Sequence, residues 1–326
     1  MKTLSLVKTV VVAMLCIGCD SIVVPDIELR PQGSLDSSPD GAAFADVRYL
    51  AYSDSLISFF DFILQQGVLV DESFKHTSAI GRKGRGPLEF TGCDGMFRRA
   101  DSIYFADYSL PGLKLYTDGK ISNITQEKMA YFHPSRFVIN GGNAVFSCKS
   151  PNYLLASFMR HNNSEVSYFG TPIEYGSATS TMIHNTCSVF EHGGSYICVP
   201  EGLPYVYTVD PATNTTEMYD LSKIKGYRQS YKSSLKGRDL KVNQMRVINE
   251  DAYLLGEDLY ILYATFGRSY SCNHVLRLHI GGSIFPVCTY TLPAKLYRTI
   301  CATNNSIIAY NPNNGKIVRL PIPKKE

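Results

Sequence analysis

The sequence contains no tryptophan and little charge. Of its 326 residues, only 19% are Asp, Glu, Lys or Arg, and the net charge is +3. This near balance excludes a strongly basic nucleic-acid-binding protein. The absence of Trp weighs modestly against carbohydrate binding, because Trp offers the largest aromatic face for stacking, although Tyr can replace it. The 22 Tyr, 16 Phe, 25 Gly and 16 Pro favour strands and turns over helices.

Short metal-binding and catalytic motifs are also missing. The seven histidines never occur as H-x-H, H-E-x-x-H or H-x3-H, and there is no D-x-D-x-D calcium loop. Ser195 and Ser283 each follow a Gly-Gly pair, which indicates hairpin turns and not a nucleophile elbow. We therefore expect no metal, no cofactor and no catalytic residue, although ligands can also be assembled from segments far apart in the sequence.

The N-terminus has the pattern of a secretory signal. A basic start precedes an apolar run over residues 10–17, which is shorter than the ~20 residues of a membrane-spanning helix. Gly18-Cys19 resembles a bacterial lipobox, in which the cysteine becomes the lipid-modified first residue of the mature chain, although Cys16 stands where Leu is usual. We expect residues 1–18 to be a lipoprotein signal peptide and Cys19 to carry the lipid. Ordinary cleavage with an incidental Cys19 is the alternative.

One pattern occurs six times along the rest of the chain. Each copy is an alternating apolar strand, a tight polar turn and a second, more apolar strand. The second strands are predicted to begin at Asp54, Asp101, Asn143, Ser195, Asp258 and Asn305. About four strands in 40–50 residues is typical of a β-propeller blade, so we expect an all-β, six-bladed β-propeller. A β-sandwich with coincidental spacing is the alternative.

The sixth copy is one strand short. Residues 22–29 have strand character and no blade of their own, and Pro25 suits an edge strand. We expect this N-terminal strand to complete the last blade and so close the ring. The domains that follow are a lipid-anchored tether with the closing strand over 19–35 and a six-bladed propeller over 36–326.

Two segments resemble a known family. Residues 81–90, GRKGRGPLEF, resemble the G-x-x-G-x-G-P-x-E-F segment of six-bladed propeller lipoproteins from the bacterial phylum Bacteroidota. Residues 103–120 look like a blade of the NHL type. On these motifs and the repeat spacing, the chain resembles TolB-like six-bladed β-propeller lipoproteins of the Bacteroidota. The resemblance implies the fold and an envelope location, and it implies no particular activity.

Glycines in the first of these segments also fit a phosphate-binding loop. Gly81, Gly84 and Gly86 are interleaved with cations. A phosphate loop opens a helix, whereas here a strand follows, so a turn between blades is the better interpretation. Arg82 and Arg85 would give that turn a rim suited to anions.

A recognition surface is predicted where the second strands end. Six or seven residues after the predicted starts, five copies have a polar residue: Asp61, Asp107, Lys149, Glu201 and Asn311. In a propeller these strand ends reach one face, where ligands bind around the central channel. We expect these residues, with Arg82 and Arg85 on the adjacent connection, to form a partner-binding rim. The alternative is that strands simply end in polar residues.

The longest spacing between copies contains a basic stretch. Residues 223–238 include two tyrosines, no acid and six cations: Lys223, Lys225, Arg228, Lys232, Lys236 and Arg238. Cations interleaved with aromatics suit nucleic acid, but an envelope protein rarely meets it. We expect a solvated loop between blades 4 and 5. Contact with anionic lipid headgroups or an acidic partner is the functional alternative.

Seven cysteines remain after Cys16 and Cys19, an odd number without C-x-x-C spacing. Cys187 and Cys198 flank a Gly-Gly turn and could face each other across a hairpin. Most of the seven are expected to be buried thiols that pack as small apolar side chains.

These observations leave three functional interpretations. The favoured one is a lipid-anchored binding or scaffold module, exported to the outer membrane, that recognises a protein or glycan partner of the envelope. The alternatives are a channel-mouth enzyme, such as a glycan lyase or hydrolase, and a structural subunit of an outer-membrane assembly. Without an acid, base or nucleophile motif we expect no catalysis, and we expect no nucleic-acid partner.

Mass spectrometry of the mature protein tests the N-terminal prediction. The first residue should be Cys19 carrying two or three acyl chains, because one chain anchors a protein only marginally. A Cys19→Ala variant should lose the acylation. An N-terminus at Asp20, or a chain that retains residues 1–18, would contradict the prediction.

Overall fold

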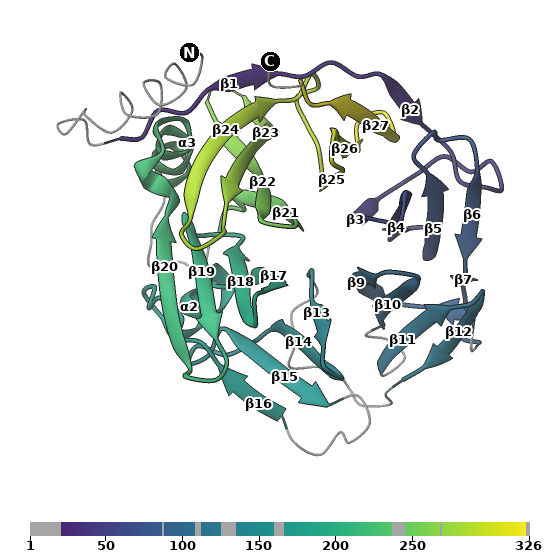
Figure 1. The fold of residues 1–326 in the computed structure, drawn as a ribbon, viewed down its shortest axis with the longest axis horizontal. Coiled ribbons are helices and arrows are strands. Elements are labelled where there is room, and N and C mark those ends of the chain that lie inside the picture. The colour runs from purple at the N-terminus through teal and green to yellow at the C-terminus, as the bar shows by residue number, and fades with distance from the viewer. Residues whose placement is uncertain are drawn as a thin grey trace, which may run out of the picture.

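Six sheets of four or five strands surround a common centre as the blades of a propeller (Figure 1). The computed structural model describes residues 21–86, 88–107, 112–124, 135–159, 166–236, 245–267 and 269–323. The all-β, six-bladed fold predicted from the sequence is confirmed. Among the described residues, no helix is both long and apolar enough to cross a membrane. Residues 1–18, Cys19 and Arg238 lie outside the described residues.

The first four blades each contain four antiparallel strands in chain order. Blade 1 consists of β3 (Val47–Ser53), β4 (Leu56–Asp61), β5 (Gln66–Asp71) and β6 (Thr77–Ile80). Blade 2 consists of β9 (Cys93–Arg99), β10 (Ser102–Asp107), β11 (Gly112–Thr117) and β12 (Lys120–Asn123). Blade 3 consists of β13 (Val138–Asn140), β14 (Asn143–Ser147), β15 (Leu155–Met159) and β16 (Val166–Phe169). Blade 4 consists of β17 (Cys187–His192), β18 (Ser195–Pro200), β19 (Tyr205–Asp210) and β20 (Thr215–Asp220).

The last two blades are completed by the N-terminal segment. Blade 5 consists of β21 (Asn249–Leu255), β22 (Asp258–Phe266), β23 (Tyr270–His279) and β24 (Phe285–Thr291), with β1 (Asp26–Glu28) added parallel to β24. Blade 6 consists of β25 (Thr299–Ala302), β26 (Ser306–Asn311) and β27 (Lys316–Pro321), and its outer strand is β2 (Gly33–Leu35), antiparallel to β27.

An N-terminal strand therefore closes the last blade, but residues 22–29 do not supply it. That segment extends blade 5 through β1, and the closing strand β2 follows a few residues later. The sequence of β2 is Gly-Ser-Leu. With a single apolar residue it shows no alternation, which is why the sequence pattern did not indicate it.

The second strands could be predicted from the sequence because both of their faces are buried. Five of the six residues in β4, β10 and β18 are buried, as are all six in β26. Tight turns with positive φ precede these strands, for example Asp54 at 51° and Gly194 at 87°. Asp, Asn and Gly tolerate this backbone region better than other residues. All six second strands begin within two residues of their predicted starts.

Short elements connect the blades. The two-residue strands β7 (Arg82–Lys83) and β8 (Glu89–Phe90) pair in parallel between blades 1 and 2. Helix α2 (Ala178–His184) lies between blades 3 and 4. The one-turn helix η1 (Leu221–Lys223) and helix α3 (Lys225–Leu235) lie between blades 4 and 5.

Helix α3 replaces the solvated loop predicted for the basic stretch. Tyr227, Ser230 and Ser234 are buried at spacings of three and four residues, so they form one face that packs on the propeller. The Tyr227 hydroxyl donates a hydrogen bond to Oδ1 of Asn249 at 2.7 Å. The loop prediction was wrong because one Tyr and two Ser give almost no hydrophobic periodicity.

All seven cysteines from Cys93 onward are buried and have free thiols. This confirms that they pack as small apolar side chains. Cys187 lies opposite Pro200, and Cys198 lies opposite Val189, so the two cysteines of this hairpin are diagonal neighbours. Burial raises the pKa of the Cys198 thiol, which favours its unreactive protonated form.

Replacing Leu29 tests how much the N-terminal segment stabilises the ring. Its side chain is 3% exposed in the main core, and its amide donates to the Thr291 carbonyl at 3.0 Å. Leu29→Ala should lower the free energy of unfolding by about 2–5 kcal/mol because it leaves a core cavity. The control Val23→Ala, at a residue that is 72% exposed, should change it by less than about 0.5 kcal/mol. Chemical denaturation measures both, and equal stability would mean that the segment is only a tether.

Candidate functional site at the channel mouth

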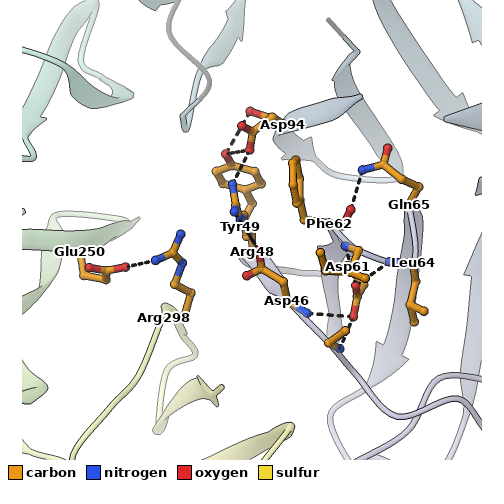
Figure 2. Close-up of polar contacts among 12 residues, drawn as sticks. Asp46, Arg48, Tyr49, Asp61, Phe62, Leu64, Gln65, Asp94, Glu250 and Arg298 are labelled. Carbon is orange, nitrogen blue, oxygen red and sulfur yellow. Dashed lines mark hydrogen bonds and ion pairs between the residues drawn. The ribbon is translucent and has the colours of Figure 1, made fainter. Parts of the chain in front are cut away.

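The ends of the second strands do not form an exposed rim. Asp61 is buried, and its carboxylate accepts hydrogen bonds from three backbone amides at 2.8 to 3.0 Å (Figure 2). Asp107 is buried beside Lys114, with 3.2 Å between Oδ2 and Nζ. Asn311 is also buried, and its Oδ1 accepts a hydrogen bond from a backbone amide two residues later at 2.9 Å. The prediction placed these three residues on an exposed rim, whereas the structure places them inside their blades, where their polar atoms bond to the chain itself.

A polar cavity of about 250 Å³ lies where the innermost strands begin. All six blades contribute to it: Arg48 and Tyr49, Asp94, Arg136, Ser188 and Glu201, Glu250 and Asp251, and Arg298 and Thr299, in blade order. Each innermost strand begins beside the end of its antiparallel second strand. The cavity is therefore on the face that the sequence predicted. Of the predicted rim residues, Glu201 lines it.

The cavity residues that the sequence analysis missed also lie at a regular offset from the predicted second-strand starts, but before these starts and not after them. Seven residues before five of the predicted second-strand starts stand Asp94, Arg136, Ser188, Asp251 and Arg298. Arg48 stands six residues before the remaining start, Asp54. The prediction counted only forwards from these starts. A backward count reaches the innermost strand, which is the strand that faces the centre of a propeller.

Arg136 and Asp251 form a buried ion pair across the centre of the ring. Nε and Nη2 of Arg136 each lie 2.7 Å from a different carboxylate oxygen of Asp251, so the contact is bidentate. Nη2 also donates to the carbonyls of Leu50 at 3.0 Å and Ile300 at 2.9 Å. Arg136 precedes β13 of blade 3, so this one side chain joins blade 3 to blades 5, 1 and 6.

Three further ion pairs neutralise the other two arginines of the cavity (Figure 2). Arg48 lies 2.8 Å from Asp46 in its own blade and 2.8 Å from Asp94 in the next blade. Arg298 lies 2.8 Å from Glu250, which joins blades 6 and 5. Each of these two arginines has a carboxylate partner, so neither contributes an unpaired positive charge to the cavity.

Tyr49 has a strained backbone at this site, with φ of 58°. It lies in a β-bulge of β3, where the pairing register shifts between Arg48 and Ala51. The bulge brings its hydroxyl within 2.9 Å of an oxygen of Asp94, to which it donates (Figure 2). A non-glycine residue in this backbone region costs about 1–3 kcal/mol, and such strain concentrates at functional sites.

Glu201 is an acid of the cavity without an ion-pair partner among the described residues. Its backbone carbonyl accepts the amides of Ile248 at 2.7 Å and Asn249 at 3.1 Å, which hold it at the junction of blades 4 and 5. Burial, and then the neighbouring carboxylate of Glu250, raise the pKa of Glu201 to about 7. Glu201 therefore changes charge near neutral pH. In the described ranges, no group of three His, Cys, Asp or Glu side chains is placed to hold a metal.

The exposed cations of the predicted rim lie away from this cavity. Arg82 borders a groove between blades 1 and 2, and its Nε is 3.0 Å from Oε1 of Glu89. The other oxygen of Glu89 accepts the Gly86 amide at 2.7 Å, so a carboxylate of the chain itself occupies the glycine-rich turn. This favours a blade connection over a phosphate loop. Arg85 and Lys149 are exposed and do not line the cavity.

Solved structures from Bacteroides share this fold, whereas no family model and no curated protein matches the sequence. A Bacteroides fragilis protein, provisionally named an exported protein, is 12% identical to this chain. Its TM-score is 0.60, over 93% of this chain and 100% of its own. A Bacteroides thetaiotaomicron protein of unknown function is 12% identical, with a TM-score of 0.57 over 90% of this chain and 74% of its own. An auxiliary nutrient binding protein of the same organism is 10% identical, with a TM-score of 0.52 over 85% of this chain and 69% of its own.

Identities this low show the fold alone. The class of this protein is therefore a six-bladed β-propeller with a charged cavity at its centre. The comparison with these Bacteroides proteins identifies no ligand for this chain.

Removing Arg136 tests the central ion pair. Arg136→Met should lower the free energy of unfolding by about 3–5 kcal/mol, because it leaves Asp251 buried without its cation. The control Arg298→Met removes a partly exposed pair and should cost at most about 1 kcal/mol. Adding Asp251→Leu to Arg136→Met should recover part of the loss. Denaturation measures all three variants, and an Arg136→Met protein as stable as the wild type would rule out the joining role.

Proposed function

We propose that this chain is an exported, lipid-anchored binding protein and that the cavity at the channel mouth is its recognition site. The observation that carries the proposal is the convergence of charged and polar side chains from all six blades on one cavity. The blades hold these side chains on a rigid scaffold, as recognition requires. The lipobox at Cys19, the resemblance to TolB-like lipoproteins, and the fold shared with exported and nutrient binding proteins of Bacteroides support an envelope location.

A cationic group of an envelope protein or glycan is the ligand that the cavity suits best. Its volume of about 250 Å³ is small, so it takes the end of a larger partner more readily than a whole drug-sized molecule. The three arginines are already paired, whereas Glu201 has no such partner among the described residues. An inserted ammonium or guanidinium would neutralise Glu201 through charged hydrogen bonds.

Calorimetric titration with Nα-acetyl-arginine amide tests this function. The probe should bind, and its neutral isostere Nα-acetyl-citrulline amide should not. Glu201→Gln should weaken binding of the arginine probe about 10- to 100-fold, as expected when a charged hydrogen-bonding partner is lost. The control Glu217→Gln, at an exposed position of β20, should leave binding unchanged. Equal binding of the two probes, or no effect of Glu201→Gln, would contradict the proposal.

The pH dependence of the same titration is a second readout. The guanidinium stays protonated, so changes near neutral pH come from the protein. Because the pKa of Glu201 is raised to about 7, the carboxylate is charged above that pH and becomes neutral below it. Affinity should therefore be highest above about pH 7 and fall as the pH drops through this value. Binding near pH 7 should also release protons, and the Glu201→Gln variant should lose both effects.

A channel-mouth hydrolase or lyase is the second candidate. The raised pKa of Glu201 suits a general acid at neutral pH, and Glu250 places a second carboxylate in the same cavity. Turnover of an envelope glycan by the wild type, lost in Glu201→Gln and kept in Glu217→Gln, would replace the binding proposal by this one.

A further inference from the structure

Helix α3 carries a basic surface at the edge of the propeller, formed with η1 by Lys223, Lys225, Arg228, Lys232 and Lys236. The helix contains no acid, and its buried face of Tyr227 and two serines leaves these cations on the outer side. The four lysines are exposed. Within the part of the chain that the structure describes, no carboxylate lies within ion-pair distance of them. The four lysines therefore give this surface positive charges that no carboxylate of the described chain neutralises.

The N-terminal segment is fastened to the start of this helix. The amide of Ile22 donates to the carbonyl of Lys223 at 2.6 Å, and the amide of Lys225 donates to the carbonyl of Ile22 at 2.9 Å. Figure 1 shows α3 on the outside of the ring, beside the segment that leads to β1. Ile22 and Val23 are 40% and 72% exposed, so two apolar side chains accompany the cations.

Cys19 precedes Ile22 by three residues. Three residues of chain span at most about 10 Å, whatever their conformation. An acyl chain on Cys19 would therefore hold the start of α3 within about that distance of the lipid headgroups. A lipid attached at Cys19 would therefore lie at the same edge of the molecule as the basic surface.

We propose that the basic surface of α3 binds anionic phospholipid headgroups and thereby fixes which edge of the propeller faces the membrane. The orientation rests on the proposed lipid at Cys19, whereas headgroup binding by α3 does not. Cations near a membrane surface each contribute about fivefold to partitioning onto anionic lipid. The exposed Ile22 and Val23 add apolar contact at the same edge.

This orientation also places the recognition cavity. Helix α3 joins the end of β20 to the start of β21, and β21 begins with Asn249 and Glu250 at the cavity. The basic surface and the cavity are thus on the same side of the ring. A partner that binds in the cavity would therefore approach it close to the membrane surface, on the side of the ring that carries α3.

Vesicle flotation tests headgroup binding without the lipid anchor. The protein is the mature chain from residue 19 with Cys19→Ser, and the vesicles are phosphatidylglycerol mixed with phosphatidylcholine, or phosphatidylcholine alone. Binding should occur to the mixed vesicles only and should weaken with added salt. The variant Lys225→Gln/Lys232→Gln/Lys236→Gln should partition about 100-fold less, at about fivefold per cation.

A matched variant controls for net charge. Lys75→Gln/Lys120→Gln/Lys295→Gln removes three exposed lysines that lie outside η1 and α3 and should leave partitioning unchanged. Equal losses in the two triple variants, or equal binding to phosphatidylcholine alone, would overturn the proposal. Melting curves establish that both variants fold.

The fully acylated chain tests the orientation. On mixed vesicles, hydrogen exchange in α3 should be slower than on phosphatidylcholine vesicles, and exchange in β12 on the opposite side of the ring should not change. Equal exchange in α3 on the two kinds of vesicle would overturn the orientation. Headgroup binding by a chain whose Cys19 proves unmodified would refute the anchor and leave the α3 surface standing.

Discussion

The guanidinium of Arg136 is the point on which this ring depends. Each blade packs mainly on its two neighbours, but Arg136 contacts more distant blades. It lies just before the first strand of blade 3 and bonds to Asp251 in blade 5 and to backbone carbonyls in blades 1 and 6. A charge buried in this way is stable only if its partners stay in place, because desolvation is costly and is offset by near-ideal geometry. The pair therefore sets the relative positions of four blades. It also forms part of the wall of the cavity, so the architecture and the proposed recognition site share one interaction.

The electrostatics of the site follow from that arrangement. Pairing neutralises Arg48, Arg136 and Arg298, and what remains available is the carboxyl of Glu201, with its pKa near neutrality. If the cavity is a recognition site, as proposed, it would favour a cation, because its arginines are already paired with carboxylates. Tyr49, held at positive φ beside Asp94, shows that backbone strain is tolerated at this point, where the six blades together determine its conformation.

The N-terminal segment has more than one structural role. It adds β1 to blade 5, supplies the outer strand β2 of blade 6, and bonds to the start of α3. A proposed anchor at Cys19 would thus be attached to the closure of the ring and not to a free tether. The bonds between this segment, the helix and the blades are what would make a defined orientation at a membrane feasible, with the proposed recognition cavity on the same side.

The sequence by itself determined the features that are encoded over short distances. Second strands with two buried faces and turns that begin with Asp, Asn or Gly are each visible within about ten residues, and their regular recurrence along the chain identifies six blades. It also indicated the face of the ring on which the polar cavity lies. It did not distinguish a polar side chain that turns back into its own blade, such as Asp61, from one that faces the centre, such as Glu201, because both simply follow an apolar strand. Helix α3 was missed because its buried face is a tyrosine with serines. Only the tertiary structure decided which charges pair: Arg136 and Asp251 are separated by 115 residues, and nothing local relates them until the ring closes and brings them to its centre.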